Sequence, residues 1–365
     1  MNRIEVAIVG AGVTGLAVAR ELESRGVAVA VVEREGIGAG ASGVQPGGVR
    51  QQWGTRVACR LARESVEFWR EVDTRLDARV TLSFSSCGYL FAAQKEATLA
   101  RLAANVALQH EEGIPSRIVR SEDVAELVPG LDSEAVVGGA WCGEDGYFDR
   151  PQAVVEAFAA GLEVEHATVD AIVRDGAGWT VGPFTADAVV VAAGVDTARL
   201  VAPLGVELPI AAEERYLFFS DPIRERLLEP LVVVPERGFA AKQLADGRVL
   251  ASDLTARGDE REGRERWRAT IRSASDALLP QLEHVSYPLL VRGIYDVTPD
   301  HQPILGQIGD GIFVAAGFSG HGFMIAPAVA RIVADAVAGL DDPVLDVLGV
   351  ERFAAGRLVP EPQLV

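Results

Sequence analysis

The sequence contains few of the residues that build metal centres and disulfide frameworks. Only three of its 365 residues are cysteines, and Cys59, Cys87 and Cys142 are too far apart for a metal-binding pair and too few to staple a domain. The five histidines show no ligand spacing either. We therefore expect the cysteines to be small buried hydrophobic residues, and we expect no metal site.

Basic residues and long apolar runs are also scarce. The chain has 34 lysines and arginines against 52 aspartates and glutamates, a net charge of −18 that disfavours binding to nucleic acid or to anionic membranes. Its most apolar segments are of strand length or are interrupted by glycine and charge, and the first residues enter a strand without a basic signal region. These features favour a cytoplasmic protein with neither a membrane nor a nucleic-acid partner.

The residues that are abundant indicate a folded chain. Hydrophobic residues make up 49% and charged residues 24%, which is the composition of a globular protein with a substantial core. The length exceeds that of a typical single domain, yet no Gly/Ser/Pro-rich linker divides the chain. This combination predicts two domains that interleave along the sequence.

The first 33 residues have the pattern of a β-α-β unit. Residues 4–9 are strand-like, a G-A-G-V-T-G run and an amphipathic segment to about Arg25 follow, and a second apolar strand at 27–32 ends at Glu33. Such glycines allow a tight turn, access of the backbone to a pyrophosphate and close helix packing, while the acid accepts from ribose hydroxyls. The unit predicts an adenine dinucleotide site with contacts from Gly10, Gly12, Val13, Thr14, Gly15, Glu33 and Arg34.

Two later segments return the chain to the same sheet. Residues 188–194 form a fully apolar run that stops at a glycine, as buried parallel strands do. Farther on, a strand at 312–316 leads through G-F-S-G-H-G-F at 317–323 into a helical run over 324–338. Glycines at such a junction let backbone N–H groups face a ligand, and the helix N-terminus favours negative charge there. Both parts of the chain are therefore expected to contact one dinucleotide.

The remaining segments predict a second, antiparallel domain. Residues 81–92, 215–220 and 248–253 are β-rich, and residues 56–72 and 260–279 are helix-like. We expect an α/β fold in which a Rossmann-type cofactor-binding domain (1–80, 145–210 and 285–365) is interleaved with an antiparallel-sheet substrate domain (81–144 and 211–284).

The pattern as a whole resembles the FAD-dependent amine and D-amino acid oxidase superfamily, which includes sarcosine oxidase, glycine oxidase and the β-type subunits of sarcosine oxidase and proline dehydrogenase. The resemblance covers nearly the whole chain and implies FAD rather than NAD, because an NAD-binding protein has no reason to return its C-terminus to the cofactor. The segments that carry it are Gly10–Gly15 with Glu33, Gly40–Gly43, Gly47–Gln52, Ala193–Gly194, Thr298–Pro303 and, most specifically, Gly317–Phe323.

The resemblance also implies how FAD is held. Relatives that attach the flavin covalently often use a cysteine shortly before the Thr-Pro-Asp stretch, and this chain has Gly293 there, so non-covalent FAD is expected. Val169 is expected to present its backbone to the adenine, and Gly320 to Met324 to surround the pyrimidine end of the flavin. Further expected contacts are Ala41, Ser42, Gly47, Gly48, Ala193, Gly194, Gly317, His321, Gly322 and Phe323.

The implied reaction is hydride transfer from a carbon that bears nitrogen to the flavin N5, giving an imine that water hydrolyses. Arg50 matches the arginine with which sarcosine-oxidase-like members bind the substrate carboxylate, and its planar guanidinium suits a two-pronged contact. Met324 stands where those enzymes have a lysine, so we expect one full charge and room for a large apolar substituent. Tyr295 either points at the substrate or fills the layer between the domains.

The sequence is compatible with two roles for some residues and with more than one reaction. Asp253, near the position of an active-site histidine in sarcosine oxidases, either holds a substrate ammonium or is an ordinary strand-end aspartate. Val249 stands near where those oxidases place a lysine over the flavin, so the electron acceptor is O2, giving H2O2, or a partner. The expected substrate is an amino acid or secondary amine of the N-substituted glycine, glycine or sarcosine type. The alternatives are a 2-hydroxy acid oxidoreductase and a β-like subunit of an amino acid dehydrogenase complex, and a homo-oligomer is compatible with each.

Overall fold

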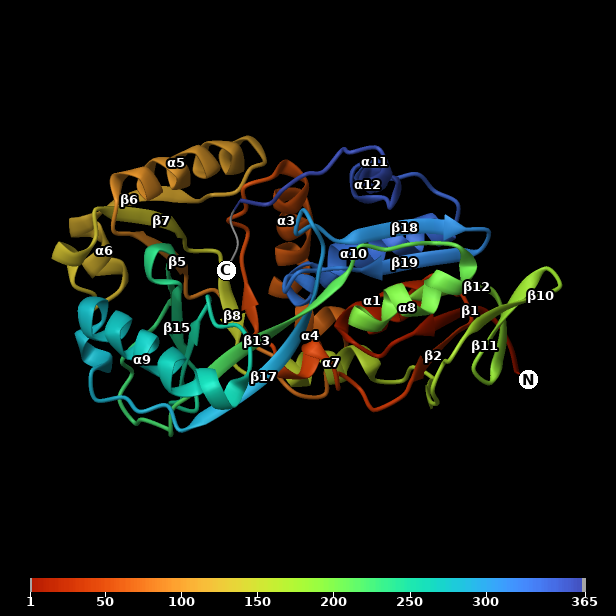
Figure 1. Cartoon of the computed structure of the whole chain (residues 1–365), viewed down its shortest axis with the longest axis horizontal. Coiled ribbons are helices and arrows are strands. Elements are labelled where there is room, and N and C mark those ends of the chain that lie inside the picture. Colours follow the sequence, from red (N-terminus) through yellow and green to blue (C-terminus); the bar gives the residue numbers. More distant parts are fainter. Residues whose placement is uncertain (1, 363–365) are drawn as a thin grey trace.

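The computed structural model describes residues 2–362 and contains two eight-stranded sheets and one three-stranded sheet (Figure 1). In the first sheet, β12, β1, β2 and β9 are parallel neighbours, β19 is parallel to β12, and β10, β11 and β18 add antiparallel pairs. This arrangement confirms the predicted β-α-β unit. The strands are β1 (Asn2–Val9), β2 (Val29–Glu33), β9 (Val164–His166), β10 (Ile172–Asp175), β11 (Gly178–Val181), β12 (Phe184–Val191), β18 (Ile304–Gly309) and β19 (Ile312–Ala316).

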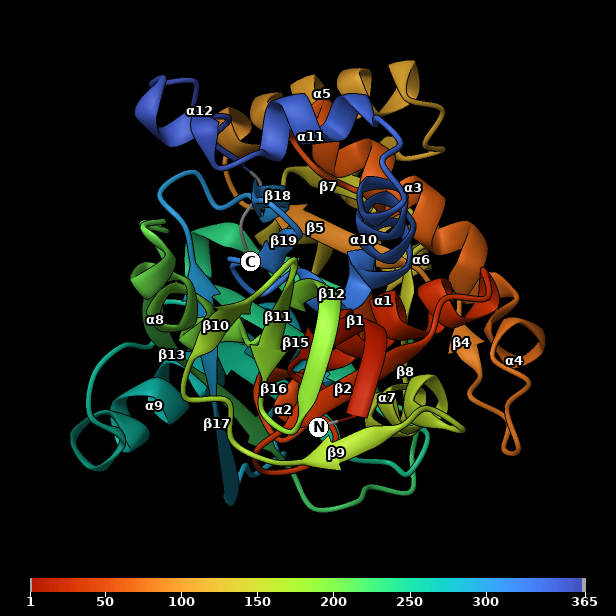
Figure 2. The same cartoon turned by 90° about the vertical axis from the view of Figure 1, so that its right-hand side faces the viewer.

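Both faces of this sheet are buried. Along β1, Val6 and Ile8 enter the core that α1, α3, α7 and α10 share, whereas Ala7 and Val9 enter a separate core with α8. Strands buried on both faces are continuous hydrophobic runs, which is why the apolar runs of the sequence located them. The helices, seen from the side in Figure 2, are α1 (Val13–Ser24), α3 (Arg56–Arg70), α7 (Pro151–Ala159), α8 (Thr197–Val201) and α10 (Gly322–Val337).

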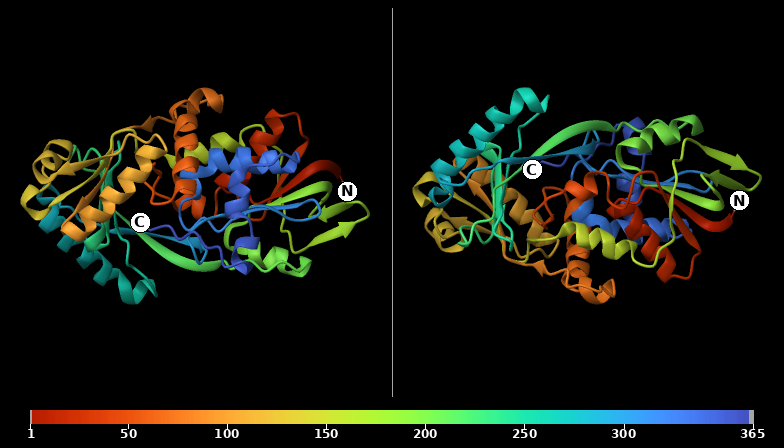
Figure 3. Two further views of the ribbon diagram at one scale, coloured as in Figure 1. Left: turned by 90° about the horizontal axis from the view of Figure 1, so that it is seen from above. Right: turned by 90° about the horizontal axis from the view of Figure 1, so that it is seen from below.

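The second sheet lies at the opposite end of the molecule from the N-terminus (Figures 1 and 3). Its order is β17-β13-β16-β15-β14-β5-β7-β6, and all its neighbours are antiparallel except β14 and β5, a parallel pair that the sequence did not indicate. The elements are β5 (Tyr89–Ala93), β6 (Arg117–Arg120), β7 (Gly138–Cys142), β13 (Ala211–Phe219), β14 (Leu231–Val234), β15 (Phe239–Gln243), β16 (Val249–Asp253) and β17 (Leu289–Val297), with α5 (Glu96–Glu111), α6 (Ser121–Leu127) and α9 (Glu260–Leu278).

Two features connect the sheets. Strand β17 falls in the segment 285–365 that the sequence assigned to the cofactor-binding domain, yet it pairs with β13 along its whole length in the second sheet. The small sheet has the order β3-β8-β4 and joins residues of both predicted domains. Its strands are β3 (Gly48–Val49), β4 (Phe84–Ser85) and β8 (Gly146–Phe148), and the remaining short helices are α2 (Ala41–Val44), α4 (Val72–Arg75), α11 (Pro343–Leu348) and α12 (Glu351–Ala354).

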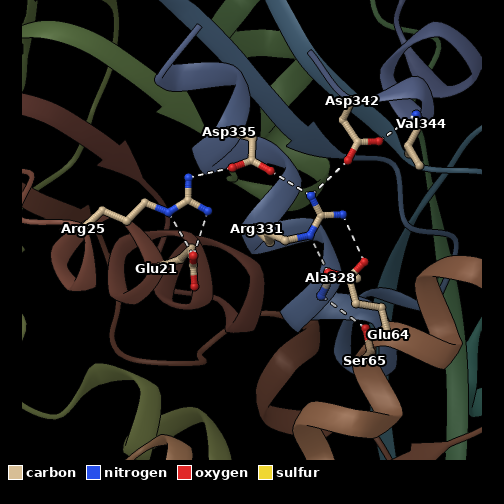
Figure 4. Close-up of polar contacts among 9 residues, drawn as sticks. All are labelled: Glu21, Arg25, Glu64, Ser65, Ala328, Arg331, Asp335, Asp342 and Val344. Atoms are coloured by element: carbon tan, nitrogen blue, oxygen red, sulfur yellow. Dashed lines mark hydrogen bonds and ion pairs between the residues drawn. The ribbon is translucent and has the colours of Figure 1, made fainter. Parts of the chain in front are cut away.

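A charge cluster fixes α10 to its neighbours (Figure 4). Arg331 on α10 pairs with Glu64 of α3, with Asp335 one turn along its own helix and with Asp342, which caps α11. Asp335 also pairs with Arg25 at the end of α1. The hydrogen bonds that the Arg331 guanidinium donates to the Glu64 carboxylate are the main reason that the pKa of Arg331 is raised. The cluster holds in register the helix whose N-terminus follows the glycine-rich 317–323 loop.

Within residues 2–362, no helix is both long and apolar enough to cross a membrane. The described His, Cys, Asp and Glu side chains form no group of three or more that could hold a metal ion. Cys59 and Cys142 are buried free thiols, and burial raises the pKa of Cys59 to about 12, which keeps that thiol protonated near neutral pH.

The segment after α12 is tied back to the cofactor-binding domain by a buried ion pair. The Arg352 guanidinium donates to both carboxylate oxygens of Asp300, at 2.8 and 3.0 Å, and both side chains are almost fully buried. The Asp300 carbonyl accepts from the Glu361 backbone N–H, and the Glu361 carboxylate accepts from Gly54 N and Thr55 Oγ1, both at 2.8 Å. The chain therefore returns to the start of α3.

We expect Arg352→Met to lower the free energy of unfolding by about 3–5 kcal/mol, because it leaves the Asp300 carboxylate buried without its partner. The double variant Asp300→Asn/Arg352→Met should lose less, since no buried charge remains. Chemical denaturation of the three proteins measures both effects. A single variant that unfolds within about 1 kcal/mol of the wild type would contradict this account.

This ion pair also predicts a pH dependence. Burial acts to raise the pKa of Asp300, but the hydrogen bonds and charge of Arg352 outweigh it and lower the pKa. The contribution of the pair should therefore be complete above the unfolded-state value of about 3.9 and be lost as the pH falls through the lower folded-state pKa. In Arg352→Met, the free energy of unfolding, measured by chemical denaturation at a series of acidic pH values, should therefore fall less steeply as the pH drops below about 3.9.

Candidate functional site

A cavity of about 570 Å³ lies at the carboxyl ends of the parallel strands. Val9, Glu33 and Ala315 line it from the ends of β1, β2 and β19, and Ala192 lines it just beyond β12. Open α/β sheets bind ligands at this edge, where the strands stop and the loops diverge. The cavity therefore occupies the position that the sequence predicted for the dinucleotide.

The glycine-rich turn after β1 is shaped for a close backbone approach. Gly10 has φ +108°, and a Cβ there would stand 2.5 Å from the Ala192 carbonyl oxygen. A Cβ on Gly15 would stand 2.1 Å from the Gly10 oxygen, so Gly15 permits helix packing and does not line the cavity. The N-cap Gly12 has no side chain to cap α1, and Ser42 Oγ accepts from the Val13 N–H at 2.9 Å. This open helix N-terminus fits a diphosphate.

Glu33 and Arg34 lie on the cavity wall where β2 ends. One Glu33 carboxylate oxygen accepts from the Ala11 N–H and the other from the Glu35 N–H, both at 2.8 Å. Arg34 pairs with Asp196 at 2.8 Å, and Asp196 lines the same cavity. The Glu33 carboxylate is thus held beside the glycine turn, as a ribose acceptor must be.

The 317–323 loop is locked against the end of β17. Gly317 N–H donates to the Asp296 carboxylate at 2.7 Å, and Ser319 N–H donates to the Asp296 carbonyl at 2.9 Å. Burial raises the pKa of Asp296 to about 6. Gly320 has φ +92°, and a Cβ there would stand 2.2 Å from the Tyr295 ring, so no larger residue fits against this tyrosine.

A second cavity of about 140 Å³ adjoins the first and extends toward the second sheet. Its volume is below the range of about 300–1,000 Å³ that is typical of drug-sized ligand sites, so it suits a small molecule. Apolar and aromatic side chains dominate its lining, together with Arg50, Arg215, Lys242 and His321. The residues that line both cavities are Ala41, Val44, Gln45, Gly293, Tyr295, Gly320 and Phe323.

Arg50 contributes a buried cation to the second cavity. Its guanidinium lies 3.7 Å from the centroid of the Trp53 ring and donates to the Gln52 carbonyl at 3.0 Å. Burial lowers the pKa of Arg50, while the nearby Tyr89 and Glu361 act to raise it. An arginine keeps its proton in proteins, so this position carries a full positive charge.

The segment around Arg50 is held by a buried acid. Asp145 accepts from the Gln51 backbone N–H at 2.9 Å and from Gln52 Nε2 at 3.1 Å, and Gln52 also donates to the Tyr89 carbonyl at 3.0 Å. Burial raises the pKa of Asp145 to about 6. Sequence reasoning missed Asp145 because it is more than ninety positions from its partners.

His321 lies beside this cation. Its ring packs edge-on against the Trp53 ring, and the two ring centroids are 4.2 Å apart. Burial, and then the charge of Arg50, lower the pKa of His321 well below its usual value, so the imidazole is neutral near pH 7. It lines the second cavity and not the first.

The structure does not bring Asp253 into either cavity. Side chains alternate along β16, and Leu250 and Ser252 face the second cavity, so Val249 and Asp253 face the other way. Asp253 Oδ1 accepts from the Thr255 N–H at 2.9 Å and from its hydroxyl at 2.6 Å, which is the strand-end arrangement that the sequence left as an alternative. The Asp253 carboxylate is therefore bound within its own turn and faces neither cavity.

The other predicted residues divide between the cavities and their supports. Gly48, His321 and Met324 line the second cavity alone. Gly47 and Gly317 line neither, and they allow tight turns: a Cβ on Gly47 would stand 2.6 Å from the Phe148 oxygen. Those that line the first cavity are Gly10, Gly12, Val13, Thr14, Glu33, Arg34, Ala41, Ser42, Val169, Ala193, Gly194, Gly293, Tyr295, Gly320, Gly322 and Phe323.

Lys242 is the cavity residue of greatest interest that sequence reasoning missed. It lies on β15 in the second domain and is almost fully buried. A lysine directly after three apolar residues in the strand F-A-A-K-Q was the available signal.

Comparison with known proteins assigns a family to this arrangement. Residues 5–336 match the DAO family of FAD dependent oxidoreductases. A glycine oxidase of Geobacillus kaustophilus is 28% identical over 92% of this chain and 93% of its own length. The 4-methylaminobutanoate oxidase (formaldehyde-forming) of Paenarthrobacter nicotinovorans is 24% identical over 97% of this chain, but the match covers 46% of that protein's length. The crystal structure of L-proline dehydrogenase from P. horikoshii has a TM-score of 0.89 at 26% identity and covers 98% of this chain and 99% of that one. The chain belongs to the FAD dependent oxidoreductase family, and FAD is its cofactor.

Proposed function

We propose that this enzyme oxidises the carbon–nitrogen bond of a small amino acid or secondary amine of the N-substituted glycine type. The observation that carries the proposal is a small, mainly apolar cavity that adjoins the cofactor cavity and contains the buried Arg50 cation. The glycine oxidase and methylaminobutanoate oxidase among its relatives, whose names describe amino acid and amine substrates, support it.

The first cavity would hold FAD without a covalent bond. The open α1 N-terminus would receive the diphosphate, Glu33 the ribose hydroxyls, and Gly320 to Phe323 the flavin end. No cysteine is among the described residues that line either cavity. Bound FAD supplies the acceptor for the hydride of the carbon next to nitrogen.

The residues of the second cavity would bind and orient the substrate. Arg50 would bind the carboxylate and so fix which carbon faces the cofactor cavity. Tyr295 and Phe323 line both cavities and would exclude water where the two meet. Apolar surroundings disfavour an ammonium ion, so the apolar lining of the second cavity would favour the neutral form of the substrate amine. The carbon next to a neutral amine nitrogen can release a hydride.

A flavin-bleaching screen tests the proposed reaction. Under anaerobic conditions, N-substituted glycines should bleach the flavin of the purified holoenzyme, and 2-hydroxy acids should leave it oxidised. We further propose O2 as the acceptor, so admitting air should restore the yellow colour and release H2O2. Bleaching by hydroxy acids alone would overturn the proposed substrate class, and bleaching without reoxidation by O2 would overturn only the oxidase assignment.

We expect Arg50→Ala to lower the second-order rate constant for flavin reduction by about two to four powers of ten. Removing one member of a buried charge pair costs about 3–5 kcal/mol, and each 1.36 kcal/mol corresponds to a factor of ten. Arg50→Lys should recover only part of the rate, because a compact ammonium cannot make a two-pronged contact.

Stopped-flow reduction with a carboxylate substrate and its matching amide measures the effect. The amide should be slow with the wild type and little affected by Arg50→Ala. If the variant slows both substrates equally, Arg50 is structural, and Arg215 and Arg292 are the next candidates for the carboxylate.

We expect Glu33→Ala to weaken FAD binding by about 1.5–3 kcal/mol, the typical contribution of hydrogen bonds to a charged acceptor. Turnover at saturating FAD should change little, because Glu33 lies on the wall of the first cavity and does not line the second. Titration of the apoprotein with FAD, followed by flavin fluorescence, gives the dissociation constant. Unchanged affinity would remove Glu33 from the ribose.

A further inference from the structure

Lys242 is a second basic residue, besides Arg50, that is almost fully buried and lines the second cavity. On β15, Ala240 and Lys242 lie on one face and Phe239 on the other, where Phe239 packs in the core with α9. Lys242 is in register with Leu250 of β16, which also lines the cavity. The side chain is 2% exposed. The position is thus part of the buried wall and not of the protein surface.

The ammonium group of Lys242 has only neutral partners within residues 2–362. Its Nζ donates to the Pro46 carbonyl and lies 3.9 Å from the centroid of the Tyr147 ring. No described carboxylate forms an ion pair with it. Asp149 is the acid that acts on it at longer range, and one Asp149 oxygen already accepts from the Ala245 N–H at 2.8 Å. An ammonium has three N–H donors, so two are left for a ligand.

Lys242 and Arg50 lie in different electrostatic surroundings. Lys242 contacts the titratable side chain of Tyr147. The other charged or titratable groups that act on it are Asp149, Cys87 and Arg226, and Arg226 itself pairs with Glu229. Those around Arg50 are Tyr89, Glu361, Asp145, Cys59 and His321. The two sets share no member. A single substrate carboxylate bound by Arg50 would therefore leave Lys242 without an anionic partner.

Burial of an ammonium without a negatively charged partner is unfavourable and favours the neutral amine. Burial lowers the pKa of Lys242 to about 7, with Arg226 lowering it further and Asp149 and Cys87 acting to raise it. An anion that entered the cavity beside Lys242 would favour its protonated form. An anionic ligand, rather than a carboxylate of the protein, could therefore form the ion pair with Lys242.

We propose that Lys242 binds a second anionic group of the substrate, so that the substrate is a dicarboxylic amine: an N-substituted glycine whose substituent ends in a carboxylate. This rests on the proposed function, in which Arg50 takes the glycine carboxylate. The apolar lining, which includes Leu217, Leu231 and Met324, contacts the methylene groups between the charges. The sequence has Met324 where sarcosine oxidases have a second cation. In this proposal Lys242 on β15 supplies that second positive charge.

The test is a binding titration that needs no turnover. Glutarate and butyrate are added separately to the holoenzyme at pH 6.5, and perturbation of the FAD absorption spectrum gives each dissociation constant. The wild type should bind glutarate at least about tenfold more tightly, as expected for one added buried charge contact. Lys242→Met should remove this preference and leave butyrate within about twofold. Lys242→Arg should retain most of it, and the surface control Arg248→Met should retain all of it.

A pH series provides a second measurement on the wild type, for use if Lys242→Met fails to fold or loses FAD. Glutarate favours the protonated lysine, so its affinity should fall by about tenfold or more as the pH rises from 6 to 8.5, while butyrate affinity stays nearly constant. Calorimetry in buffers of different ionisation enthalpy should show proton uptake when glutarate binds near pH 8.

The outcomes separate the two proposals. Equal binding of glutarate and butyrate by the wild type, or an equal loss of both in Lys242→Met, would overturn the role of Lys242 while leaving amine oxidation intact. A glutarate preference that depends on Lys242, in a holoenzyme that no amine bleaches, would instead uphold the anion site and overturn the proposed reaction.

Discussion

Burial of positive charge in an apolar cavity is the constraint on which the rest of the site depends. An unpaired guanidinium transferred from water into such surroundings would cost several kcal/mol, so the protein must surround Arg50 with compensating groups. The Trp53 ring face and the Gln52 carbonyl do so directly, and Glu361 and Asp145 do so at longer range. The same positive charge helps keep His321 neutral. The loop before α3 therefore contains Arg50 together with the residues that compensate its buried charge most directly.

The C-terminal segment belongs to this arrangement. Glu361 is almost fully buried and accepts hydrogen bonds from Gly54 and Thr55, which directly follow Trp53, whose ring stacks on Arg50. The Arg352–Asp300 pair holds that segment in place, and Asp300 lies in the turn between β17 and β18. Residues near the end of the chain thus stabilise a loop that is three hundred positions away in the sequence. Arg352 is therefore connected to the loop around Arg50 in the second cavity although it does not line that cavity.

Strand parity decides which side chains of the second sheet meet the cavity. Adjacent residues of a strand point to opposite faces, so a difference of one position separates Leu250 and Ser252, which line the cavity, from Val249 and Asp253, which do not. Lys242 meets the cavity from the neighbouring strand, in register with Leu250. Arg50 follows β3 of the small sheet and Lys242 lies in the second sheet, so the separation of these two side chains depends on how the sheets pack.

The sequence by itself determined the cofactor half of the protein. Apolar runs buried on both faces located β1, β2, β12 and β19, and the glycine turns and Glu33 located the cavity at their ends, because these signals act within a few residues of one another. Only the tertiary structure decided the lining of the second cavity. The face of β16, the placement of Lys242, the support from Asp145 and Glu361, and the pairing of β17 with β13 depend on contacts between segments far apart in the chain. No local pattern encodes these contacts, because burial and charge compensation arise only when the two domains pack together.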